Sequence, residues 1–148
     1  RGAESGFLAL GEEPLDVVLL NQVIEHVEDD RGLLAMTRRI LRPEGTLILG
    51  TPNEGCRLQQ RWLRRKNRLQ QTDHVHFYTE AEIRAKIEEA GFVIDSAMRE
   101  VFFIGSYPLY YWLTARGWGF RFLELLTRIW PSQCSDYYFE CRPRPAAP

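Results

Sequence analysis

Three segments follow one another in a fixed order along this chain, and each joins an apolar stretch to a polar one. Residues 15–26 (LDVVLLNQVIEH) run from an apolar strand into a polar cluster. Residues 41–53 (LRPEGTLILGTPN) lead through a Pro-Gly turn into a second apolar strand and a polar loop, and residues 74–83 (HVHFYTEAEI) bring histidines to a helix start. Ligands of open α/β sheets bind outside the carboxyl ends of such strands. The order therefore predicts an α/β fold with a site where these polar segments meet.

A strand–helix–strand unit is expected in the first half of the chain. Residues 15–20 form a continuous apolar run, which is typical of a strand buried on both faces of a parallel sheet. Apolar side chains recur at near-helical spacing over residues 29–41, and Pro43 and Gly45 are expected to end that helix. A second strand follows at residues 46–51. This rhythm predicts a right-handed crossover between two parallel strands.

The second half of the chain is expected to add a helix and two strands to the same sheet. Thr79 and Glu82 fit a capping box at the start of a helix over residues 79–90. The pattern predicts that a strand begins at residues 92–94 and that a final strand spans residues 135–141.

An aromatic-rich segment at about residues 105–131 separates these last strands and is expected to form two short helices. With 148 residues, the chain is long enough for one domain. We expect a partial domain over residues 1–141, which includes the aromatic-rich insertion. The Pro-rich residues 142–148 are expected to be a disordered tail.

Composition narrows the classes of function. A net charge of −1 gives no general attraction to polyanions, and no nucleic-acid-binding motif is recognised, so we expect no nucleic acid partner. The three cysteines are too widely spaced for a Cys-x-x-Cys pair, and their odd number favours reduced thiols and a cytoplasmic location. No apolar run reaches the ~18–20 residues that a membrane span needs.

The polar cluster after the first strand contains Asn21, Gln22, Glu25 and His26. If a helical turn begins there, Gln22, Glu25 and His26 lie on one face. A carboxylate beside an imidazole could serve as a general base, because histidine titrates near neutral pH. The alternative is that Glu25 and His26 are solvated residues of a loop.

Two further clusters are candidates for substrate contact. Pro52 and Asn53 follow the second strand, although Pro-Asn also favours a simple turn. His74, His76 and Tyr78 occupy alternate positions, which share one face of an extended segment. A zinc site made by the three histidines of the chain is conceivable, but His-x-His spacing is weak evidence and we expect no metal. Alternatively, this segment only packs the loop onto the sheet.

The segment 57–68 is strongly basic. It suits an anionic substrate or a peripheral contact with a membrane surface, and its alternative is a solvated helix. Its cations are Arg57, Arg61, Arg64, Arg65, Lys66 and Arg68.

Together, the segments over about residues 1–95 resemble the second half of a class I S-adenosylmethionine-dependent methyltransferase domain. The resemblance implies a partial Rossmann-like fold with strands 4 to 7 of the seven-stranded sheet, the last strand antiparallel, and S-adenosylmethionine as cofactor. The Gly-rich cofactor loop of this family does not occur in the sequence. By the resemblance, the chain starts near the third strand and keeps the fourth to the seventh, and we expect it to be inactive alone.

The chain is similar to the ubiquinone-biosynthesis O-methyltransferases at residues 22–26. Those enzymes carry Glu-x-x-Glu-His, which can hold a divalent metal, whereas Gln22 here removes one charged ligand. By the resemblance, His26 is the first candidate for a general base, and Glu25 is its partner. The contacts implied for the cofactor are Ala3, Glu4, Asn21 and Gln22, and those implied for the substrate are Pro52, Asn53, His74, His76 and Tyr78.

The function implied is methyl transfer to an oxygen, nitrogen or carbon of a small-molecule acceptor or of one linked to a lipid or glycan. The competing hypothesis is a non-catalytic half-domain that acts in dimerisation or partner binding. Without a first strand beside it, the strand at residues 15–20 would be an apolar sheet edge. Either a homodimer forms through that edge, or residues upstream complete the sheet, or the fragment folds poorly alone. The polar cluster at residues 21–26 favours the enzyme.

Overall fold

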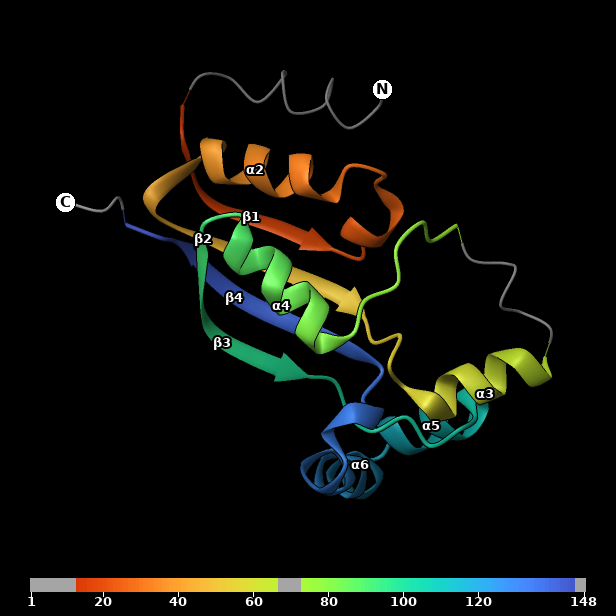
Figure 1. Ribbon diagram of the computed structural model, residues 1–148. Coiled ribbons are helices and arrows are strands. Elements are labelled where there is room, and N and C mark those ends of the chain that lie inside the picture. The colour runs from red at the N-terminus through yellow and green to blue at the C-terminus, as the bar shows by residue number, and fades with distance from the viewer. Residues whose placement is uncertain (1–12, 67–72, 146–148) are drawn as a thin grey trace.

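The structure, a computed structural model, describes residues 13–66 and 73–145. Its centre is a four-stranded sheet of β1 (Leu15–Asn21), β2 (Leu41–Pro52), β4 (Asp136–Pro143) and β3 (Phe92–Arg99), in that spatial order (Figure 1). β1 is parallel to β2, and β4 runs antiparallel to both β2 and β3. The partial α/β fold and the antiparallel final strand are thus confirmed.

Two helices pack on one face of this sheet. The 3₁₀ turn η1 (Ile24–His26) and α2 (Asp30–Ile40) connect β1 to β2, and α4 (Glu80–Glu89) precedes β3 (Figure 1). The main core lies between these helices and alternate residues of the strands. Its fully buried aliphatic side chains include Ile24, Leu34, Leu47, Leu49, Ile83 and Ile87.

The expectation that residues 15–20 are buried on both faces is wrong. Val18 and Leu20 point into the core, whereas Val17 and Leu19 are exposed, with 63% of Leu19 accessible. The reason is that α2 and α4 share one core with the inward residues, and no helix in residues 13–66 and 73–145 covers the other face. β1 lies at the sheet edge, as expected.

A second group of helices lies beyond the ends of β2 and β3 (Figure 1). It contains α3 (Arg57–Arg65), α5 (Tyr107–Thr114) and α6 (Gly117–Ile129), and the short η3 (Pro131–Gln133) leads from it into β4. The expected pair of helices in the aromatic-rich segment is therefore present. Their shared core includes Cys56, Phe102, Phe103, Tyr110, Leu113 and Leu123. Among the described helices, none has the length and apolarity to cross a membrane.

Local signals in the sequence set several boundaries. The Thr79–Glu82 capping box is present, and Gly91 has a φ of 83°, a left-handed conformation that glycine adopts freely. The expectation that disorder begins at residue 142 is wrong. β4 continues to Pro143, and the backbone N–H of Arg144 donates to the Gly91 carbonyl. Residues 146–148 lie outside the described part.

Candidate active site

A cavity of about 320 Å³ lies where the carboxyl ends of β1 and β2 meet the start of β4. This is the edge of the sheet at which the sequence predicts a ligand site. Two larger and more open hollows lie elsewhere, one beside α6 and one along α3. The residues that line the cavity are Gln22, Pro52, Glu54, Gln59, Leu63, His74, Glu100, Tyr107, Tyr110, Tyr111, Ser135 and Asp136.

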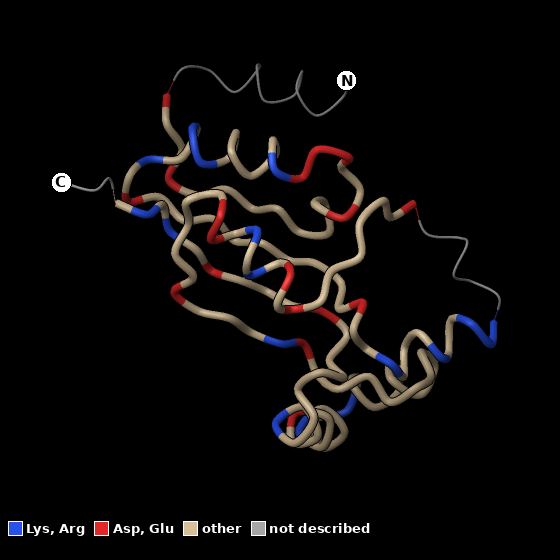
Figure 2. The backbone as a smooth tube through the Cα atoms, viewed as in Figure 1, with Lys and Arg blue, Asp and Glu red and all other residues tan. Residues whose placement is uncertain are grey.

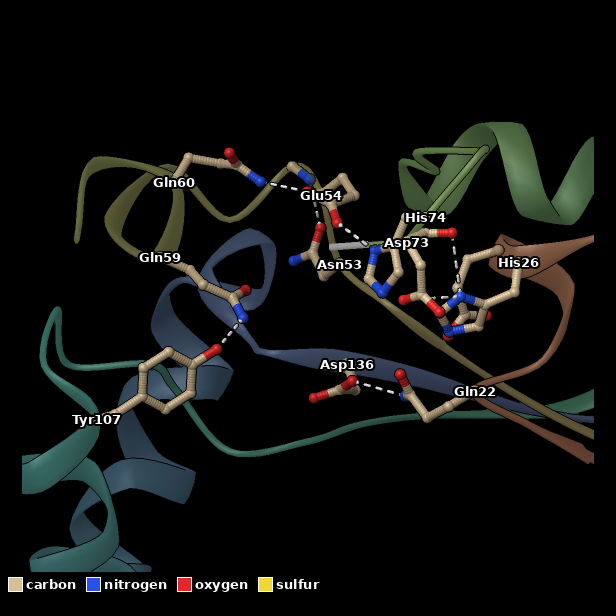
Figure 3. Close-up of polar contacts among 12 residues, drawn as sticks. Gln22, His26, Asn53, Glu54, Gln59, Gln60, Asp73, His74, Tyr107 and Asp136 are labelled. Atoms are coloured by element: carbon tan, nitrogen blue, oxygen red, sulfur yellow. Dashed lines mark hydrogen bonds and ion pairs between the residues drawn. The ribbon is translucent and has the colours of Figure 1, made fainter. Parts of the chain in front are cut away.

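Gln22 enters the cavity because the backbone turns sharply at the end of β1. Its φ is 55°, in the left-handed region that a residue with a side chain occupies at a cost. The Gln22 N–H donates to the Gly50 carbonyl, and its side-chain Nε2 donates to Asp136 Oδ1 at 2.9 Å (Figure 3). Two hydrogen bonds thus hold a strained residue at the site, as functional positions often require.

Two carboxyl groups, those of Glu100 and Asp136, lie together beside Gln22. They hydrogen-bond each other, and the Ser135 hydroxyl donates to Glu100. Burial and the hydrogen bond with Glu100 raise the pKa of Asp136 to about 7. Burial also acts to raise the pKa of Glu100, but hydrogen bonds with Asp136, Ser135 and Tyr110 hold it below its ordinary value. The pair therefore retains one proton close to neutral pH.

Tyrosines form one wall of the cavity. The rings of Tyr107 and Tyr111 stack with centroids 6.0 Å apart, and Gln59 Nε2 donates to the Tyr107 hydroxyl at 2.7 Å (Figure 3). Burial raises the pKa values of Tyr107 and Tyr110, so both phenols stay neutral. The wall therefore offers aromatic faces and hydroxyls without negative charge.

Most of the ionisable side chains that line the cavity, apart from the tyrosines, are acidic. Glu54, Glu100 and Asp136 contribute carboxyl groups, whereas no lysine or arginine is among the lining residues, all of which the structure describes. The only basic side chain there is His74, whose Nδ1 lies 3.5 Å from Glu54 Oε1. A cavity of this kind favours a cationic group over an anionic one.

Glu25, His26 and His74 meet at the rim of the site. The imidazole rings of His26 and His74 contact edge to face, and His26 Nε2 lies 3.8 Å from Glu25 Oε1. The Glu25 side chain is 1% exposed, and neither of its oxygens has a hydrogen-bond partner among the described residues. One donor atom from each residue lies within 4.8 Å of the others, so together they could hold a metal ion.

The prediction that Asn53 contacts substrate is contradicted. Asn53 is fully buried, and its Nδ2 donates to the carbonyl oxygens of Ser132 and Cys134. Its Oδ1 accepts a hydrogen bond from the Gly55 N–H. The side chain therefore has its polar atoms occupied in fixing the loop after β2, while its neighbour Pro52 does line the cavity.

Tyr78 and His76 are not among the residues that line the cavity, so the structure does not bring these two predicted substrate contacts to it. The buried Tyr78 hydroxyl donates to Asp30 Oδ2 at 2.6 Å, and Lys86 Nζ lies 2.6 Å from the same oxygen. The His76 ring stacks on Tyr78, and its Nε2 lies 3.0 Å from the Glu28 carbonyl oxygen. These residues pack the segment onto α2, so three histidines do not gather in one cluster.

Replacing Tyr78 with phenylalanine should lower the free energy of unfolding by about 1.5 kcal/mol, because the buried Asp30 carboxylate loses a hydrogen bond. Burial acts to raise the pKa of Asp30, but hydrogen bonds with Lys86 and Tyr78 hold it lower. This contribution is therefore present above the carboxyl's ordinary pKa and is lost in acid. Urea unfolding at neutral and acidic pH measures it, and an equal loss at both pH values would contradict this assignment.

The structure describes two of the four predicted cofactor contacts, Asn21 and Gln22. Asn21 ends β1 as an exposed residue, with its side chain beside Gly50. Gln22 lines the cavity and is bound to Asp136. Ala3 and Glu4 lie outside the described residues.

Sequence reasoning missed Glu100, Ser135, Asp136 and the tyrosine wall as one site. Glu100 follows β3, and Asp136 opens β4, so antiparallel pairing of these strands creates their contact. The sequence does show an acid at the start of its final strand, in the segment SDYYFEC. No local motif, however, marks its partner 36 positions earlier.

Comparisons with known proteins place this geometry in a family. Residues 4–97 match the model of a methyltransferase domain. The uncharacterized protein YafE of Escherichia coli (strain K12) is 28% identical over 94 residues, an alignment that covers 63% of this chain and 45% of YafE. The chain thus spans about half the length of the curated relative that it matches.

Solved structures agree on the fold. A Thermotoga maritima methyltransferase, described as a possible histamine N-methyltransferase, aligns with a TM-score of 0.63 and 18% identity over 90% of this chain and 58% of its own. A Mesorhizobium loti S-adenosylmethionine-dependent methyltransferase gives 0.58 and 17% over 90% of this chain and 63% of its own. This chain therefore belongs to the methyltransferase domain family, and it has a partial Rossmann-like fold of the kind seen in these solved structures.

Proposed function

We propose that this chain supplies the acceptor side of an S-adenosylmethionine-dependent methyltransferase that acts on an amine. The observation that carries the proposal is the pairing of three carboxyl groups with a tyrosine wall in a cavity that no described lysine or arginine lines. Carboxylates bind an ammonium group through charge-assisted hydrogen bonds, and aromatic faces attract it as well. An anionic acceptor would be repelled there.

The described residues fit part of the cofactor. S-adenosylmethionine supplies an electrophilic methyl group carried on a sulfonium. Asn21 and Gln22 place amide side chains at the carboxyl end of β1, and Glu25 adds a buried carboxylate with no hydrogen-bond partner among the described residues. Polar groups of this kind suit the amino-acid portion of the cofactor. Contacts of Ala3 and Glu4 with the adenine remain a proposal from the resemblance.

The carboxyl pair gives the chain a route for the proton that an ammonium must lose. An amine needs its lone pair free before its nitrogen can form a bond to the methyl carbon. Asp136 faces the cavity with a pKa raised to about 7, so its carboxylate can accept that proton near neutral pH. Gln22 holds the carboxyl in place, and the tyrosines orient the acceptor.

A hydroxyl acceptor with His26 as the base is the second candidate. It is favoured by the buried Glu25 carboxylate, which lies 3.8 Å from His26 Nε2 and could stabilise an imidazolium. Against it, the His26 ring is not among the side chains that line the cavity. A non-catalytic half-domain that dimerises through the β1 edge would need neither Glu25 nor His26.

Replacing His26 with alanine separates these candidates in an active preparation of the enzyme. With an amine acceptor, turnover should fall less than about tenfold, because His26 only supports His74 at the rim. His76→Ala is the matched control, since His76 lies outside the cavity. A loss of about a hundredfold or more in His26→Ala, with cofactor binding retained and an O-methylated product, would contradict the amine proposal and establish the hydroxyl route.

A further inference from the structure

One face of α6 carries an exposed apolar stripe. Trp118, Phe122, Leu125 and Ile129 recur at spacings of four, three and four residues, so they project from the same side of the helix. Trp118 is 61% exposed and Ile129 58%. A different face of α6 packs on α5 through Gly119 and Leu123. Nothing in the described chain covers the stripe, which is unusual for side chains this large.

Arginines border the stripe. Trp112 of α5 extends it, since its ring lies 5.8 Å from the Trp118 ring, and the Arg116 guanidinium stacks 3.8 Å above Trp112. Arg121 and Arg128 are exposed along one edge of the same helix. Within residues 107–129 there is a single acid, Glu124. The surface therefore combines tryptophan and aliphatic side chains with a positive border.

The neighbouring helix α3 adds to the positive charge. A hollow of about 590 Å³ runs along it, and its charged lining residues are one acid, Glu54, and four bases, Arg57, Arg61, Arg64 and Arg65. Figure 2 shows these basic residues at the same end of the molecule as α6. α3, α5 and α6 share one core, so the two basic surfaces are held together.

We propose that this end of the molecule, the α6 stripe with its arginine border and the basic helix α3, docks on the surface of a lipid bilayer that carries anionic headgroups. Apolar side chains on one helix face enter the headgroup boundary of a bilayer, and flanking arginines attract anionic lipids. Tryptophan suits this boundary because its ring is apolar and its N–H is polar. The bilayer surface would lie along α6, parallel to the helix.

Charge complementarity favours the bilayer over a second copy of this chain. A two-fold symmetric contact places the same patch on both sides of an interface. Here it would bring Arg116, Arg121 and Arg128 of two copies close together, with Glu124 as the only acid on α5 and α6 to offset them. An anionic surface meets the same arginines with opposite charge. The proposal does not depend on which acceptor the cavity binds.

Sedimentation with lipid vesicles tests the proposal on the 148-residue chain. Vesicles of phosphatidylcholine with about a quarter phosphatidylglycerol should bind the chain at least about tenfold more tightly than pure phosphatidylcholine vesicles. Trp118→Ser combined with Ile129→Ser should weaken binding at least about tenfold. Met98→Ser is the matched control, because Met98 is 67% exposed on β3 and does not belong to the stripe. Circular dichroism and thermal unfolding check that each variant folds.

The charge requirement is tested separately. Arg121→Gln combined with Arg128→Gln should remove most of the preference for phosphatidylglycerol, whereas Arg39→Gln, a change at an exposed position of α2, should not. Unchanged vesicle binding by the folded stripe variant would overturn the proposal. So would a chain that ignores vesicles but forms a concentration-dependent dimer in gel filtration that the stripe variant abolishes.

Discussion

Replacing Asp136 with asparagine should weaken the binding of an amine acceptor by about 10- to 100-fold. The change removes a charge-assisted hydrogen bond, which contributes about 1.5–3 kcal/mol. Asparagine keeps the shape of the side chain and can still accept from Gln22 Nε2. Titration calorimetry with 2-phenylethylamine, whose ring suits the tyrosine wall, measures the change. Glu124→Gln is the control, because Glu124 is an acid outside the cavity.

The same variant should change the pH dependence of binding. Burial and the contact with Glu100 raise the pKa of Asp136 to about 7, so its carboxylate forms as the pH rises from about 6 to about 8. The amine remains protonated over this range, and its binding to the native chain should therefore tighten. In Asp136→Asn, affinity should stay nearly level. An equal pH dependence in both proteins would contradict the assignment of the titrating group.

Stability should move in the opposite direction with pH. The folded chain keeps a proton on Asp136 at pH values where the unfolded chain has released it. The contribution of this carboxyl to folding is therefore complete below its unfolded pKa of about 4 and is lost as the pH rises through about 7. Urea unfolding should show that Asp136→Asn loses less stability than the native chain as the pH rises from about 4 to about 7.

Replacing Gly119 with alanine should lower the free energy of unfolding by about 3 kcal/mol, the upper part of the range for overpacking a core. A Cβ atom at this position would lie 2.4 Å from the Leu113 carbonyl oxygen and 3.0 Å from the Leu113 Cα. Both are backbone atoms, so α5 and α6 would have to move apart. The shared core around Leu123 would then open.

Gly117 provides the matched control for this experiment. A Cβ atom at Gly117 meets nothing within 4 Å, although it begins the same helix two residues earlier. Gly117→Ala should therefore leave the stability unchanged or raise it slightly. Denaturant unfolding followed by tryptophan fluorescence reports both variants. Equal stabilities would show that the two helices do not pack as closely as the structure has them.

Local signals allowed much of the fold to be predicted. The Thr79–Glu82 capping box marked the start of α4 because its two hydrogen bonds depend on residues only three positions apart. Gly91 marked the helix end for a similar reason. Burial of residues 15–20 could not be predicted, because an apolar run does not record which of its faces another element covers. Val17 and Leu19 are exposed for that reason.

The site was harder to predict because its chemistry arises from long-range pairing. The resemblance predicts Gln22 as a cofactor contact and His74 as a substrate contact, and the side chains of both residues line the cavity. Asn53 and Tyr78 occupy similar places in the sequence but have buried partners that no local pattern reveals. The Glu100–Asp136 pair exists only once β3 and β4 are aligned. The raised pKa of Asp136 depends on the burial of its carboxyl group and on the contact with Glu100, neither of which a local pattern records.

The most direct test of the central claim is a titration of the 148-residue chain with a matched amine and alcohol. 2-Phenylethylamine and 2-phenylethanol have the same ring and chain length, so they differ chiefly in the group that the carboxyl pair would bind. At about pH 8 the amine should bind at least about tenfold more tightly than the alcohol, because only the ammonium pairs with Asp136. Equal affinities, or tighter binding of the alcohol, would contradict an amine-binding acceptor site.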